Sequence, residues 1–195
     1  GADDPANGTN PGYLSFQADR VTQMTPSPTD RRIQKGDLVQ VDGGAVYRGY
    51  CADIYRNAYV GSALPARLQV YSQASRQVLK AVVKAIRPGI TSAEMCAVAS
   101  KAARDLGVAS FRRNLTTNAD PENIYLGHGL GFSIIELPHI NPADRTPWVE
   151  NMCGTVLVSF GDEETGYVEW EDNFVVIEDG AKVLTPSPKE IWLTG

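Results

Sequence analysis

Two neighbouring runs decide the fold, GDLVQVDGG at residues 36–44 and YCADIYR at residues 50–56. Both runs are rich in β-branched and aromatic residues, and glycines lie between them, which is typical of a β-hairpin. If the turn is centred between Tyr47 and Arg48, Asp42 lies directly opposite Asp53. Facing carboxylates repel each other unless a cation lies between them. This spacing leaves two interpretations open: a divalent cation site for Mg²⁺, Mn²⁺, Co²⁺ or Zn²⁺, or two exposed aspartates beside a turn.

The residues after the hairpin predict two helices and then further strands. The first helix is predicted to begin at Pro65 and to end at residues 87–89, Arg-Pro-Gly. Thr91 and Glu94 form a capping box for the second helix, which Gly107 ends. Strand-like runs follow at residues 155–160, 167–170 and 174–177. This order predicts an α+β fold with helices on one face of a mainly antiparallel sheet.

The first 30 residues differ in composition from the rest. They are rich in Gly, Pro, Asn, Asp and Thr, and only residues 13–18 read as a possible strand. We expect residues 1–30 to be an irregular leader, or the remnant of a longer chain, and residues 31–195 to form one domain. No basic segment precedes an apolar core, so we expect a cytoplasmic location. The chain starts without Met, so we expect it to be a piece of something longer.

Composition excludes several classes of protein. The chain has 195 residues, 18 Lys and Arg against 23 Asp and Glu, and a net charge of −5. That balance argues against nucleic acid as a partner, and no apolar run approaches the length of a membrane span. The 3 cysteines show no CxxC spacing, which argues against a disulfide framework and a zinc knuckle.

Two further residues are candidate ligands. His128 lies in the glycine-rich run GHGLG at residues 127–131, and Glu171 ends the strand-like run that begins at Tyr167. A lone histidine is usually a satisfied core or surface residue, and a glutamate in a strand is usually solvated. Neither residue stands out alone.

The four motifs at residues 36–44, 50–56, 127–131 and 170–176 together resemble the pita-bread family of Xaa-Pro aminopeptidases, prolidases, methionine aminopeptidases and creatinase. The resemblance implies a pita-bread fold, a curved, mainly antiparallel sheet with helices on one face. It also implies that the domain lacks its first helix and an N-terminal domain, and that the full-length protein is a homodimer.

The resemblance further implies a metal site and a substrate. Its ligands would be Asp42, Asp53, His128 and Glu171, holding one or two ions of Mn²⁺, Co²⁺ or Zn²⁺. His128 and Glu171 would also be catalytic, Glu136 would contact the substrate, and the reaction would be hydrolysis of a peptide or small amide by water that the metal activates.

The sequence departs from the family pattern at three positions. Comparison of the strand motifs puts Phe160 where the family has a second glutamate ligand, which is also its proton shuttle. Thr25 and Ile135 stand where the family has histidines. Glu163 or Glu164 in the following loop could replace the lost ligand. We therefore expect weak binding of a single ion and impaired activity.

Three functions follow from this pattern. The first is a metal-dependent hydrolase of the Xaa-Pro aminopeptidase or dipeptidase type with a degraded site. The second is a non-catalytic relative that serves as a binding or dimerisation module. The third is a different reaction on the same scaffold, because a fold does not fix a function.

Overall fold

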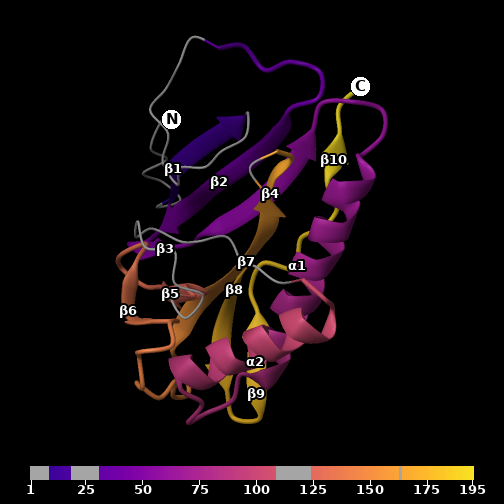
Figure 1. Ribbon diagram of the computed structural model, residues 1–195. Coiled ribbons are helices and arrows are strands. Elements are labelled where there is room, and N and C mark those ends of the chain that lie inside the picture. The colour runs from indigo at the N-terminus through magenta and orange to yellow at the C-terminus, as the bar shows by residue number, and fades with distance from the viewer. Residues whose placement is uncertain (1–8, 19–30, 109–123, 163) are drawn as a thin grey trace.

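The computed structural model describes residues 9–18, 31–108, 124–162 and 164–195. Ten strands and two helices form within these residues (Figure 1), which confirms the α+β class. The first sheet has the order β1-β2-β4-β10, with β3 paired to β2. Its strands are β1 (Thr9–Ala18), β2 (Leu38–Tyr47), β3 (Tyr50–Cys51), β4 (Ile54–Tyr59) and β10 (Trp192–Leu193).

The second sheet is antiparallel and has the order β6-β5-β7-β8-β9. Its strands are β5 (Gly127–Gly129), β6 (Glu136–His139), β7 (Cys153–Asp162), β8 (Gly166–Ile177) and β9 (Gly180–Val183). The two runs at residues 167–170 and 174–177 thus belong to one long strand, β8. No helix in the described part of the chain is long and apolar enough to cross a membrane.

The two sheets meet where β4 lies beside β8 (Figure 1). Side chains of β4 and β8 join them in place of a backbone ladder. The Asn57 amide donates to the Glu169 carbonyl at 2.6 Å and its oxygen accepts from the Glu169 amide at 3.3 Å. The Arg56 guanidinium donates to the Glu171 carbonyl at 2.7 Å. These bonds join the two sheets where β4 meets β8.

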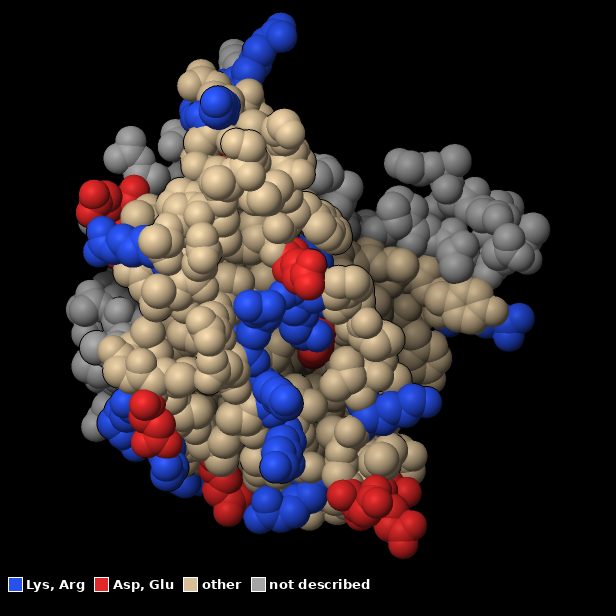
Figure 2. All heavy atoms as spheres, turned by 90° about the vertical axis from the view of Figure 1, so that its right-hand side faces the viewer, with Lys and Arg blue, Asp and Glu red and all other residues tan. Residues whose placement is uncertain are grey.

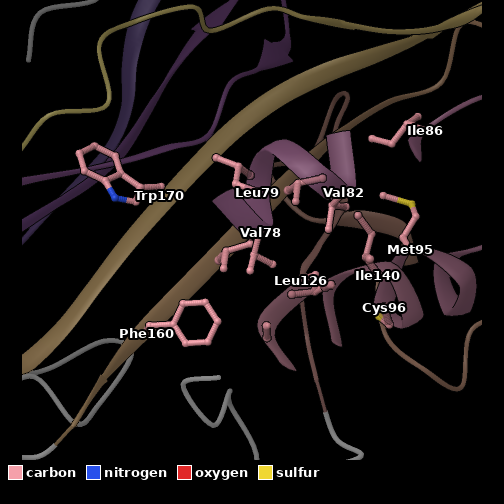
Figure 3. Close-up of a cluster of buried hydrophobic side chains, with 14 of the residues drawn as sticks. Val78, Leu79, Val82, Ile86, Met95, Cys96, Leu126, Ile140, Phe160 and Trp170 are labelled. Atoms are coloured by element: carbon pink, nitrogen blue, oxygen red, sulfur yellow. The ribbon is translucent and has the colours of Figure 1, made fainter. Parts of the chain in front are cut away.

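Both predicted helices are confirmed. Helix α1 spans Ala66–Ala85 directly after Pro65 and packs on the second sheet, and α2 spans Ser92–Asp105 and packs against α1. The Thr91–Glu94 capping box is present in both directions. Side chains from α1, α2, β7 and β8 form one core (Figure 3), to which Val78, Leu79, Val82, Met95, Phe160 and Trp170 contribute. Burial of this apolar surface holds the helices on one face of the sheet.

The register of the hairpin differs from the predicted one. Arg48 and Gly49 form a two-residue turn with φ of 49° and 88°, so the hairpin is centred one residue later than we expected. Asp42 consequently faces Tyr55, not Asp53, and the prediction of a directly facing pair of aspartates is wrong. The shift moves the partner by two positions, which keeps both aspartates on the same face of the hairpin.

The hairpin is interrupted just before β4. A Cβ atom on Gly44 would lie 1.6 Å from the Ala52 carbonyl oxygen, so only glycine fits at this close approach. The Asp53 amide leaves the ladder and donates to the Asn173 side chain at 3.1 Å. The predicted single strand over residues 50–59 is therefore two strands, β3 and β4, and Asp53 lies in the gap between them.

The expected irregular leader contains a long strand. β1 spans Thr9–Ala18 and pairs with β2, so the possible strand at residues 13–18 extends further and belongs to the first sheet. The remaining residues of the leader, including Thr25, lie outside the described part of the chain.

Candidate metal centre

Asp53, His128 and Glu171 come together from three separate parts of the fold. Asp53 precedes β4, His128 lies on β5, and Glu171 lies on β8. One ligand atom from each lies within 4.8 Å of the other two. The three residues are buried, with exposed fractions of 5%, 3% and 1%. Two carboxylates and an imidazole form a donor set that suits Mn²⁺, Co²⁺ or Zn²⁺.

Glu171 has one carboxylate oxygen satisfied and one left over. The Thr155 hydroxyl donates to Glu171 Oε1 at 2.7 Å, while Oε2 is buried without a hydrogen-bond partner. Burial raises the pKa of this carboxyl well above its usual range, and the charges of Asp53, Asp42 and Glu169 raise it further. A buried carboxylate with an unsatisfied oxygen is costly unless a cation compensates it.

His128 presents a ring nitrogen to the same place. Its Nδ1 lies 3.0 Å from the Gly129 carbonyl oxygen, which can only accept, so the proton belongs on Nδ1. Nε2 then carries the lone pair and lies 3.6 Å from Asp53 Oδ2. Burial also lowers the pKa of His128, which favours the neutral ring. A backbone carbonyl on the far nitrogen is the usual support for a metal-binding histidine.

Asp53 is positioned through its backbone by Asn173 of β8. The Asn173 side chain accepts from the Asp53 amide and donates to the Asp53 carbonyl. The Asp53 carboxylate is thereby placed opposite β8, where its charge raises the pKa of Glu171. Burial raises the pKa of Tyr125 to about 12, and the charge of Asp53 contributes to that rise. The residues present fit a divalent cation, because the carboxylates of Asp53 and Glu171 are buried together and Glu171 Oε2 accepts no hydrogen bond.

Asp42, the fourth expected ligand, does not belong to this cluster. Its carboxyl bonds to the Tyr55 hydroxyl, and burial together with the charges of Glu169 and Asp42 raises the pKa of that phenol. Asp42 is buried on the same face and its charge reaches Glu171. Asp42 therefore lies next to the centre, but its carboxyl is already hydrogen-bonded to Tyr55.

Phe160 is not the residue that faces the cluster, which corrects our motif comparison. It pairs with Val168, and both side chains lie in the core under α1 (Figure 3). Leu157 pairs directly with Glu171. Side chains alternate along a strand, so Leu157 and Phe160, three positions apart, point to opposite faces. Leu157, directly opposite Glu171, is 6% exposed and offers no ligand atom on this face.

The proposed substitutes and the substrate contact lie elsewhere. The Glu164 side chain is 81% exposed and pairs with Arg67 at 2.8 Å, so the idea that it completes the site is wrong. Glu163 is outside the described residues. Ile135 is half exposed, and the Glu136 carboxylate accepts from the Ser133 amide at 2.7 Å beside β5.

Sequence reasoning missed three residues that shape the centre. Asn173 and Thr155 position Asp53 and Glu171, and Leu157 limits the donor set. The signal for Asn173 was its place two residues after Glu171, on the same face of a strand. Thr155 and Leu157 could be recognised only through the register between β7 and β8.

Comparison with known proteins agrees with this arrangement. The model of metallopeptidase family M24 matches residues 7–178. An Xaa-Pro dipeptidase of Pyrococcus furiosus is 32% identical over 163 residues, which are 84% of this chain and 44% of that protein. The chain thus spans less than half of that relative.

Solved structures give the same result and confirm the pita-bread fold. The dipeptidase PepE of Mycobacterium ulcerans superposes with a TM-score of 0.80 at 27% identity, covering 94% of this chain and 47% of that one. The prolidase of Pyrococcus furiosus superposes with a TM-score of 0.75 at 30% identity, covering 90% and 49%. With its sequence matched over most of its length and its buried Asp, His and Glu in place, the chain belongs to metallopeptidase family M24.

Proposed function

We propose that this chain carries a metal-dependent hydrolase site of the peptidase type, with Xaa-Pro peptides as its substrate class. The observation that carries the proposal is the buried Asp53, His128 and Glu171 cluster with one glutamate oxygen left without a donor. The M24 match and the similarity to a named Xaa-Pro dipeptidase support the class of reaction.

The protein residues have separate tasks in this proposal. Asp53, His128 and Glu171 would hold one divalent cation, which supplies Lewis acidity to polarise a carbonyl and to make water more acidic. Thr155 holds Glu171 Oε1, so Oε2 is the oxygen available to a ligand or a proton. Glu136, beside β5, is the proposed contact for the substrate. The full-length protein is proposed to be a homodimer.

Turnover should be low, because two positions lack groups that move protons. Leu157 faces Glu171, and Ile135 occupies a position where the family resemblance implies a histidine. Neither side chain can donate or accept a proton. Loss of a positioned acid or base costs about 10²-fold or more in rate.

Hydrolysis of a Leu-Pro dipeptide tests the proposal. The chain is freed of metal with a chelator, and Mn²⁺, Co²⁺ or Zn²⁺ is then added back. We expect slow release of proline that needs the added ion and disappears in Asp53→Ala. Asp179→Asn, an exposed carboxylate change, is the matched control and should retain the rate. Proline release that persists in chelator, or in Asp53→Ala, would contradict the proposal.

A second candidate, a binding module without catalysis, is favoured by one observation. An apolar side chain, Leu157, occupies the position directly opposite Glu171. The same experiment separates the two, because a binding module would take up the ion without releasing proline.

A further inference from the structure

A groove with a volume of about 580 Å³ opens between α1 and β9, on the helix side of the second sheet. Successive residues of a strand point to opposite faces, so Asp172 points into this groove while Glu171 points to the candidate metal centre. The lining combines apolar side chains with a run of Lys and Arg, and Figure 2 shows this blue run beside a hollow that also holds a carboxylate. The lining residues are Leu79, Val83, Ala181 and Val183 with Arg76, Lys80, Lys84 and Lys189.

The groove is positively charged although the chain carries a net charge of −5. Its one carboxylate, Asp172, is only 4% exposed and is already paired with Arg56 at 3.1 Å and Lys189 at 2.6 Å. Among the described residues, no carboxylate pairs with Arg76, Lys80 or Lys84. The Arg76 guanidinium donates to the Lys189 carbonyl at 2.8 Å, and Lys80 and Lys84 are exposed beside it. The field of this row attracts an anionic partner.

The spacing along α1 points to the shape of that partner. Arg76, Lys80 and Lys84 are four residues apart, so they form one row roughly 12 Å long. Val83 is the partly exposed apolar side chain of α1 beside this row, whereas Leu79 is buried in the core at the base of the groove. An apolar row flanked by a charged row is the pattern with which helices recognise one another.

The opposite wall leaves room for a second helix. Gly180 and Ala181 have little or no side chain, and a Cβ atom on Gly180 would meet only the Ile86 carbonyl oxygen, at 3.8 Å. The groove therefore offers space for apolar side chains next to Val83 and Ala181. The cationic row would meet acidic side chains that flank them.

We propose that this groove binds an acidic amphipathic helix of a partner protein. Leucine-sized side chains of that helix lie on the partly exposed Val83, Ala181 and Val183, and its glutamates or aspartates pair with Lys80 and Lys84. The site is separate from the candidate metal centre because the two lie on opposite faces of β8.

Fluorescence anisotropy with a designed peptide tests this. The labelled peptide has about 18 residues, long enough to form a helix, with leucine at every third and fourth position and glutamates beside them. A second peptide has lysine in place of every glutamate. We expect the acidic peptide to bind saturably, at micromolar concentration, and the basic peptide not to bind.

Variants of the full chain locate the binding. Lys80→Glu with Lys84→Glu should weaken binding by about tenfold or more. Both lysines are exposed, so thermal unfolding should show an intact fold. Arg32→Glu with Lys35→Glu changes the charge equally outside the groove and should leave the affinity unchanged. Ala181→Phe, which fills the floor without altering charge, should also abolish binding.

Several results would overturn the proposal. The proposal is wrong if the acidic peptide does not bind saturably, or if both peptides bind equally well. It is also wrong if Lys80→Glu with Lys84→Glu leaves the affinity for the acidic peptide unchanged. Displacement of the peptide by stoichiometric tripolyphosphate would instead identify a site for small anions. Concentration-dependent dimerisation that the same double variant abolishes would identify a second copy of this chain as the occupant.

Discussion

Leu157 of β7 lies directly opposite Glu171 of β8, and both side chains are buried on the face that holds Asp53 and His128. A buried leucine thus borders a buried carboxylate whose Oε2 has no hydrogen-bond partner. Leu157 therefore adds no metal-binding group to the face that holds Asp53, His128 and Glu171.

Replacing Leu157→Glu adds a carboxylate to the centre. We expect metal affinity to rise by about tenfold or more, since even supporting residues around a metal change affinity by 10–100-fold. Without metal, the extra buried charge should destabilise the fold by several kcal/mol. Calorimetric titration with Mn²⁺ and thermal unfolding with and without the ion measure both effects.

Phe160→Glu is the matched control for that change. Phe160 lies in the core under α1, so its replacement should destabilise the protein without tightening metal binding. If Phe160→Glu tightens metal binding and Leu157→Glu does not, the register between β7 and β8 differs from the one described.

Replacing Glu171→Gln should stabilise the metal-free protein. The carboxylate is buried near Asp53 and Asp42 with one oxygen unsatisfied, and an amide keeps an acceptor for the Thr155 hydroxyl without the charge. We expect the free energy of unfolding at neutral pH to rise by about 1 kcal/mol or more. Denaturant unfolding in chelator checks this, and lower stability in Glu171→Gln than in the unaltered chain would contradict it.

Asn173→Ala removes both hydrogen bonds to the Asp53 backbone. We expect it to cost about 1–3 kcal/mol in stability and to weaken metal binding about 10–100-fold. Asn57→Ala is a close match, because Asn57 makes the same two bonds to Glu169. It should cost similar stability and leave affinity nearly unchanged. Equal losses of affinity in both variants would argue against a specific role of Asn173.

Asp162 should make stability depend on pH in the acid range. The Tyr71 hydroxyl, at 2.5 Å, is the main cause that lowers the pKa of this carboxyl from 3.8 to about 2. A lowered pKa means that the unfolded chain binds the proton more readily. The stabilisation is therefore complete above about pH 4 and is lost as the pH falls toward 2.

Unfolding of Asp162→Asn measured from pH 5 to about pH 2 checks this contribution. The variant should be less stable than the unaltered chain at pH 5, and the difference should shrink with acid. Asp179→Asn, in an exposed turn, should follow the unaltered chain. A difference for Asp162→Asn that stays constant with pH would exclude the proposed linkage.

Local signals in the sequence predicted the helices well. Pro65 and the Thr91–Glu94 capping box act within a few residues of the helix starts that they define, and the structure has both helices there. Neither His128 nor Glu171 stands out alone, and both were assigned as ligands through the four motifs that resemble the pita-bread family, whereas Asp53 was also marked by the hairpin spacing.

Relationships across strands were harder to predict. The hairpin register depends on Arg48 adopting a positive φ, which the sequence signals only weakly. Because the turn lies one residue later than predicted, Asp42 faces Tyr55 and does not form a facing pair with Asp53. The side of the sheet to which Phe160 points was hard to predict for a similar reason, because the face of a strand residue follows from pairing with a distant strand.

Metal stoichiometry is the most direct test of the account. The full chain, purified without chelator and then titrated calorimetrically with Mn²⁺, Co²⁺ or Zn²⁺, should bind one ion per chain, weakly, and Glu171→Gln should abolish the binding. Two tight sites per chain, or binding that Glu171→Gln leaves unchanged, would contradict the assignment of Asp53, His128 and Glu171 as a centre for a single ion.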